Sequence, residues 1–116
     1  MRTALLVLAL AVTAALVGCT AQASTPPGPV ETAQVIMPKS YRFDPVAIQV
    51  PAGTTVTWAN QDNFTHSVSV TTGGFPLLSL SPGQSGSMTF NDPGEYNYIC
   101  TYHAQNMKGK VVVVAR

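Results

Sequence analysis

Charged residues are scarce in this 116-residue chain: they make up 9% of it, six basic against five acidic. They form no run of one sign. Arg2 falls in an N-terminal segment that we expect to be removed, which leaves five basic residues to balance five acidic ones. Proteins that bind nucleic acid present a basic patch or stripe to the phosphates. A sparse and balanced charge therefore gives no reason to expect a nucleic-acid partner.

Cysteine and histidine are also rare, with two residues of each. Two cysteines in an exported protein suggest a disulfide bond. Cys19 and Cys100 each lie in a more specific local context, however, so we do not favour a bond between them. Only His66 and His103 can supply imidazole groups. At this length the chain has room for one domain.

No apolar run is long enough to cross a bilayer, which takes about 20 residues. Ala4 to Val17 is almost entirely apolar, as in the hydrophobic region of a signal peptide, and we assign residues 1–18 to such a peptide. The run ends in Leu16-Val17-Gly18-Cys19, which resembles the cleavage box of bacterial lipoproteins. The resemblance implies that Cys19 is lipidated on sulfur and anchors the protein to a membrane of the cell envelope or cell surface. An ordinary cleavage near Ala21-Gln22-Ala23 is the alternative, and it also exports the protein.

The rest of the chain divides into a tether and a β-rich domain. Residues 19–33 are small, polar and rich in Pro, which predicts a flexible tether. From residue 34 onward, short runs of β-branched and aromatic residues alternate with turns, and no segment predicts a helix. We therefore expect residues 34–116 to form an all-β Greek-key sandwich of about seven strands, with a long loop over residues 71–83. The predicted strands are residues 35–37, 46–50, 54–58, 66–70, 85–90, 95–100 and 111–114.

The segment CTYHAQNM, residues 100–107, places a thiol, an imidazole and a thioether within eight residues. Strand alternation puts Cys100 on an inward face at a strand end, and His66 begins another strand. If those strand ends are neighbours, His66 joins Cys100, His103 and Met107. Two imidazoles and a thiolate with a weak axial thioether form the blue-copper arrangement, whereas structural zinc sites take four strong ligands and Met is not among them.

Taken singly, these residues have ordinary interpretations. Cys100 would be a buried inert thiol, since free cysteine is among the most buried residue types. His103 would be a loop histidine and Met107 a filler of the core. The metal hypothesis depends on all four side chains acting together.

The chain resembles the cupredoxins, the small blue copper proteins of the plastocyanin, pseudoazurin and amicyanin type. The resemblance spans Val35 to Val114, and it implies a β-sandwich with one type 1 copper ion. It also implies four copper ligands: His66, Cys100, His103 and Met107. The motifs that carry it are Phe43-Asp44-Pro45-Val46-Ala47-Ile48-Gln49-Val50, Gly53-Thr54-Thr55-Val56-Thr57-Trp58-Ala59-Asn60-Gln61-Asp62, the following His66, and Cys100-x-x-His103-x-x-x-Met107.

One departure from the family concerns the residue after the first ligand histidine. Many members have Asn there, and it ties that strand to the residue after the cysteine. This chain has Ser67, with Thr101 across from it. We expect the serine hydroxyl to make one such bond but not the set that an amide makes.

Three functions compete. The leading hypothesis is an exported, membrane-tethered monomer that shuttles single electrons between redox proteins. The alternative is a copper-binding or delivery lipoprotein that uses the same ligands without electron transfer. We do not expect an enzyme, because multicopper oxidation needs further histidines. A nucleophilic pair of Cys100 and His103 would leave His66 and Met107 unexplained.

Other residues have simpler expected roles. Asn60 and Asp62 are expected to form a turn before His66. We expect Trp58, Phe43 and Phe90 to lie in the core, and Tyr96 and Tyr98 to lie in the core or at its rim. An apolar patch near His103 would suit the docking of a redox partner, and core burial is an equal alternative for some of its members. Its candidate members are Phe64, Phe75, Pro76, Leu77, Leu78 and Ala104.

Overall fold

The computed structural model describes residues 28–116 together with Ala15 and Gly18. Cys19 and most of the predicted signal peptide and tether lie outside the described residues. Within the described part, no helix has the length and apolar character needed to span a membrane.

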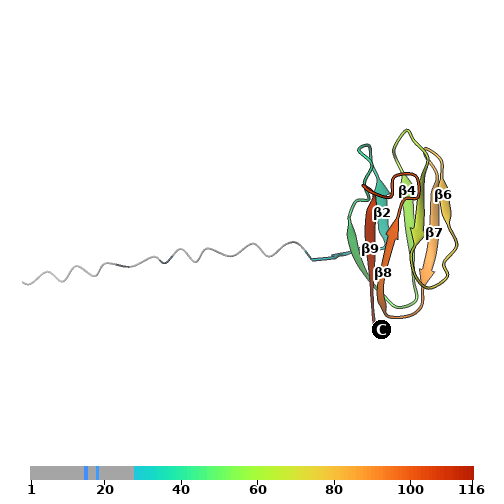
Figure 1. Ribbon diagram of the computed structural model, residues 1–116. Helices are drawn as coiled ribbons and strands as arrows, with labels where there is room; N and C mark the ends of the chain where they lie inside the picture. Colours follow the sequence, from blue (N-terminus) through green and yellow to red (C-terminus); the bar gives the residue numbers. More distant parts are fainter. Residues whose placement is uncertain (1–14, 16–17, 19–27) are drawn as a thin grey trace, which may run out of the picture.

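Residues 28–116 form nine β-strands in two sheets that pack face to face (Figure 1). One sheet has six strands in the order β1-β3-β9-β8-β5-β6, and the other has three in the order β2-β4-β7. The predicted all-β sandwich is therefore confirmed. The strands are β1 (Val30–Glu31), β2 (Gln34–Met37), β3 (Ala47–Pro51), β4 (Thr54–Asn60), β5 (His66–Val70), β6 (Leu78–Leu80), β7 (Ser85–Phe90), β8 (Gly94–Ile99) and β9 (Lys108–Val114).

All seven predicted strands are present, and two short ones were not predicted. β1 falls in the segment predicted to be a coil, where it pairs in parallel with β3. β6 falls in the predicted loop over residues 71–83, where it pairs with β5. The prediction of coil at these two places was wrong because two or three residues are too few to show a period.

The core lies between the two sheets. Trp58, Phe43 and Phe90 are buried there, as predicted, and Tyr98 is buried with them. Tyr98 pairs across β8 and β9 with Gly109, where any side chain would meet its ring. Burial raises the pKa of Tyr98 to about 12, and its ring packs edge-on against Phe43 and Trp58.

Strand register brings two distant segments to the same end of the sandwich. β5 and β8 are antiparallel with Ser69 opposite Ile99, so the start of β5 lies beside the residues that follow β8. β8 pairs with β9 with Ile99 opposite Lys108, which closes residues 100–107 into a loop between neighbouring strands. His66 and the CTYHAQNM loop therefore meet at one end, which is the upper end in Figure 1.

Candidate metal centre

His66 and Cys100 form a buried pair at this end of the molecule. The Nδ1 atom of His66 lies 3.8 Å from the Sγ atom of Cys100, and both residues are 0% exposed. A nitrogen and a sulfur bound to one ion at typical lengths, with an angle of about 110–130°, lie about 3.5–3.9 Å apart. The two donors are therefore spaced as if to share one metal ion.

Asp62 orients the ring of His66. Its Oδ2 atom lies 2.9 Å from the His66 Nε2 atom, and both side chains are buried. The hydrogen bond from His66 holds the pKa of Asp62 below its usual value, while burial acts in the opposite direction. An ionised carboxylate only accepts hydrogen bonds, so Nε2 is the donor. In a neutral imidazole the lone pair is then on Nδ1, the nitrogen near Cys100.

Asp62 was expected to form a turn, and its contact with His66 was not predicted. The available signal was an acidic residue four positions before a candidate ligand histidine. Asn60 does have the expected role: its Oδ1 atom accepts from the Asp62 N–H at 2.9 Å, and its Nδ2 atom donates to the carbonyls of Phe64 and Leu80. This buried amide fixes the turn that carries both Asp62 and His66.

Ser67 and Thr101 tie β5 to the segment after β8. The Ser67 hydroxyl accepts from the Thr101 N–H at 2.7 Å and lies 2.8 Å from the Thr101 hydroxyl. The Ser67 N–H points to the Cys100 Sγ atom at 3.4 Å. Ser67 therefore makes more contacts than the single bond expected from sequence. The Ser67 N–H is a hydrogen-bond partner of the sulfur of a candidate ligand.

Met107 and His103 are held by a tight loop. The Cys100 N–H donates to the Met107 carbonyl at 3.1 Å, and the Met107 N–H donates to the His103 carbonyl at 3.0 Å. Met107 is fully buried, whereas His103 is partly exposed. The loop thus directs one donor residue inward and leaves the other at the surface.

The rings of His66 and His103 have centroids 5.5 Å apart. Two imidazoles bound to one ion, each with its centroid about 3.2 Å from the metal, lie about 5–5.5 Å apart. Within residues 28–116, Ala15 and Gly18, no three side chains of the His, Cys, Asp and Glu types form a metal-binding group by themselves. The structure therefore brings His66 close to Cys100 and His103 close to His66. These side chains do not complete a three-residue metal-binding group of those four types among the described residues.

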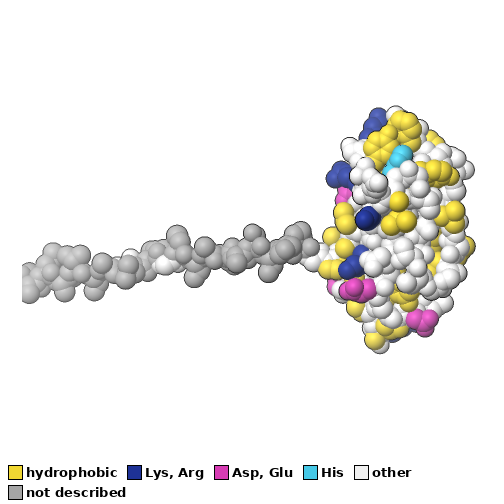
Figure 2. Space-filling view, in the orientation of Figure 1, with side chains coloured by type: hydrophobic (Ala, Val, Ile, Leu, Met, Phe, Trp, Pro, Cys, Tyr) yellow, Lys and Arg dark blue, Asp and Glu magenta, His cyan; other side chains and the backbone are white. Residues whose placement is uncertain are grey.

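An aromatic side chain packs against the partly exposed His103. The ring of Tyr41 packs edge-on against His103, with centroids 4.6 Å apart, and stacks on Phe64. Figure 2 shows an apolar cluster beside a histidine at this end, with Lys or Arg side chains next to it. Of the predicted patch, Phe64 and Leu77 are exposed, whereas Phe75 and Leu78 pack on the core.

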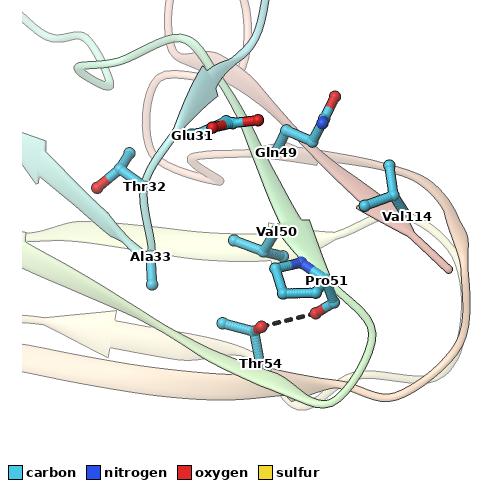
Figure 3. A pocket seen from close by; sticks show the side chains of 8 residues that line it. All are labelled: Glu31, Thr32, Ala33, Gln49, Val50, Pro51, Thr54 and Val114. Carbon is cyan, nitrogen blue, oxygen red and sulfur yellow. Dashed lines mark hydrogen bonds between the residues drawn. The ribbon is translucent and has the colours of Figure 1, made fainter. Parts of the chain in front are cut away.

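A separate hollow lies at the other end of β9, and Pro51, Thr54 and Val114 are among the residues that line it (Figure 3). No His, Cys or Met side chain lines it. It offers none of the donors found at the upper end, so we assign it no chemistry.

Comparisons of the sequence and the structure with known proteins all find cupredoxins. The family model for a cupredoxin-like domain matches residues 6–113. The chain is 36% identical to amicyanin-alpha of Methylorubrum extorquens over 90% of this chain and 98% of that protein. Its structure is similar to a purple cupredoxin from Nitrosopumilus maritimus, with a TM-score of 0.62 and 27% identity over 72% of this chain and all of that one. It is also similar to the Cu(I) form of an amicyanin mutant, with a TM-score of 0.62 and 32% identity over 78% of this chain and 87% of that one.

Proposed function

Because this chain belongs to the cupredoxin-like family, we propose that it binds one type 1 copper ion and carries single electrons. The proposed ligands are His66, Cys100, His103 and Met107. The observation that carries the proposal is the buried pair of donors, Nδ1 of His66 and Sγ of Cys100, at 3.8 Å. Amicyanin, one of the similar structures, has been solved in a Cu(I) form.

The residues present fit a copper ion of this type. Thiolate and thioether ligands suit Cu(I), and imidazoles accept both oxidation states. Once bound, the ion would supply the one-electron couple of Cu(I) and Cu(II). The chain supplies rigid donors, because Asp62 fixes the His66 ring and Ser67 fixes the backbone beside Cys100. Donors that are already in place need little rearrangement when an electron arrives or leaves.

The partly exposed edge of His103 is the proposed point of electron exchange with protein partners. Three exposed aromatic side chains lie close to it in space or in sequence: Tyr41, Phe64 and Tyr102. Lys39 and Arg42 flank Tyr41 and are exposed as well. This surface favours a redox protein with acidic residues around its own site. Electron exchange with such a partner should slow as salt concentration rises.

Retention of copper during redox cycling distinguishes a carrier from a delivery protein. The purified protein is loaded with Cu(II), then reduced with ascorbate and reoxidised with ferricyanide through repeated cycles, with a Cu(I) chelator present throughout. We expect the copper to stay bound, since the proposed donors are buried or sit in a tight loop. If the chelator takes copper from the reduced protein as fast as it takes up free Cu(I), the result would instead favour delivery.

We also propose that the protein is exported and anchored through Cys19. The support is the sequence Leu16-Val17-Gly18-Cys19 at the end of an apolar run. Cells that express the full chain should yield a membrane-bound form that incorporates a labelled fatty acid. The variant Cys19→Ser should lose the label and leave the membrane fraction. A label that persists in Cys19→Ser would contradict lipidation at this residue.

A further inference from the structure

The loop between β2 and β3 places one aromatic ring over both histidines. The ring of Tyr41 meets His103 edge-on, with centroids 4.6 Å apart and planes at 83°. It also faces His66 at 5.9 Å and 89°. On its outer side it stacks on Phe64 at 5.6 Å. Tyr41 therefore contacts both imidazoles and is itself partly at the surface.

The loop that carries Tyr41 is held at its base. Ile36 and Asp44 exchange two backbone hydrogen bonds of 2.9 Å each. The side chains of Met37 and Phe43, on either side of the loop, are buried in the core. The two ends of the loop are therefore fixed to the sandwich.

The tip adopts a backbone conformation that L-residues avoid. Ser40 has a φ of 106° and Tyr41 a φ of 53°, and neither is glycine. Side chains with a Cβ atom rarely occupy this region, and such residues cluster where a site requires a particular geometry. At this loop, the unfavourable conformation turns the Tyr41 ring back onto the histidines.

We propose that Tyr41 is a shielding and positioning residue that closes the outer side of the metal site to small anions and holds the His103 ring. The proposal rests on the function proposed above, because it concerns the same site. The apolar ring occupies the side from which a small ligand would approach His103, and the apolar surroundings of a metal site control solvent access to it. The Tyr41 ring acts through packing, so its hydroxyl is not required.

The first test measures anion binding to the copper-loaded, full-length protein. Azide is titrated into wild type, Tyr41→Phe and Tyr41→Ala, and binding is followed by visible absorption and electron paramagnetic resonance. Tyr41→Ala should bind azide at a concentration lower by about tenfold or more, whereas Tyr41→Phe should match wild type. Equal azide affinity in all three proteins, or a Tyr41→Phe variant that behaves like Tyr41→Ala, would overturn the proposal.

Tyr102→Ala is the matched control. Tyr102 is 57% exposed in the loop that carries His103, and its hydroxyl contacts Ser79. Its removal deletes a comparable ring at the same end of the molecule. Azide affinity should stay at the wild-type value in Tyr102→Ala. An increase equal to that of Tyr41→Ala would mean that any lost aromatic side chain opens the site, which contradicts a specific role for Tyr41.

A second measurement needs no copper and separates this proposal from the function on which it rests. Diethyl pyrocarbonate acylates accessible imidazole nitrogens, and mass spectrometry reports its rate at each histidine of the copper-free protein. The rate at His103 should rise by about tenfold in Tyr41→Ala and stay unchanged in Tyr41→Phe. Buried His66 provides an internal measure of intact folding, because it should stay unreactive in all variants. An unchanged rate at His103 would overturn the shielding role, whereas failure to bind copper would overturn only the proposed function.

Discussion

Replacing Cys100 by serine is expected to remove almost all of the visible absorption of the copper-loaded protein. The intense absorption of blue-copper sites comes from the bond between copper and thiolate sulfur, and a serine hydroxyl stays protonated where a thiol can ionise. Serine is close to cysteine in size, and the backbone N–H of Ser67 that points at Cys100 Sγ can donate to a hydroxyl oxygen as well. The fold should therefore survive while the copper chemistry is lost.

Absorption spectra of the two cysteine variants make this prediction specific. Cys19→Ser removes the other cysteine of the chain and should keep the full visible band, because Cys19 is assigned to the anchor. A copper-loaded Cys100→Ser protein that keeps the wild-type band would show that the coloured ligand is another group. Far-ultraviolet circular dichroism of each variant checks that the strands remain.

Replacing Asp62 by alanine is expected to lower copper affinity by about 10- to 100-fold, the usual cost of losing a partner that orients a ligand histidine. The Nε2–H group of His66 is buried and would lose its acceptor. The ring would then be free to place its hydrogen on Nδ1, the nitrogen that faces Cys100. Competition with chelators of known affinity measures the loss for both oxidation states.

Two further variants separate orientation of His66 from general damage. Asp62→Asn keeps a carbonyl acceptor at the same place, so its loss of affinity should be smaller than that of Asp62→Ala. Asp92→Ala removes an exposed carboxylate in the turn before β8 and should change nothing. Nitrogen NMR of His66 in the copper-free protein should show the hydrogen on Nε2 in wild type and Asp62→Asn. The same tautomer at full population in Asp62→Ala would rule out the orienting role.

The strands and the candidate ligands were predictable for different reasons. Alternation in segments such as His66 to Val70 reveals a strand because one face is buried and the other is not. Cys100, His103 and Met107 stood out because donor residues are rare in this chain. Their arrangement required His66 to lie beside them, and the antiparallel register of β5 and β8 provides that proximity.

The residues around the ligands could not be predicted in the same way. Asp62 looks like an ordinary turn residue, and its contact with His66 depends on a turn that Asn60 braces from within. Tyr41 lies in a loop whose direction depends on positive φ angles at two residues that rarely adopt them. Side chains of this kind are positioned by the folded loops around them, and no local period in the sequence marks them.

The visible absorption spectrum of the full-length protein with Cu(II) tests most directly whether His66, Cys100, His103 and Met107 form a redox-active copper site. We expect an intense visible band that ascorbate bleaches and ferricyanide restores, since a thiolate bonded to copper gives the colour and a rigid site survives the cycle. A protein that stays colourless with Cu(II), or that binds zinc in preference to copper, would contradict a blue copper electron carrier.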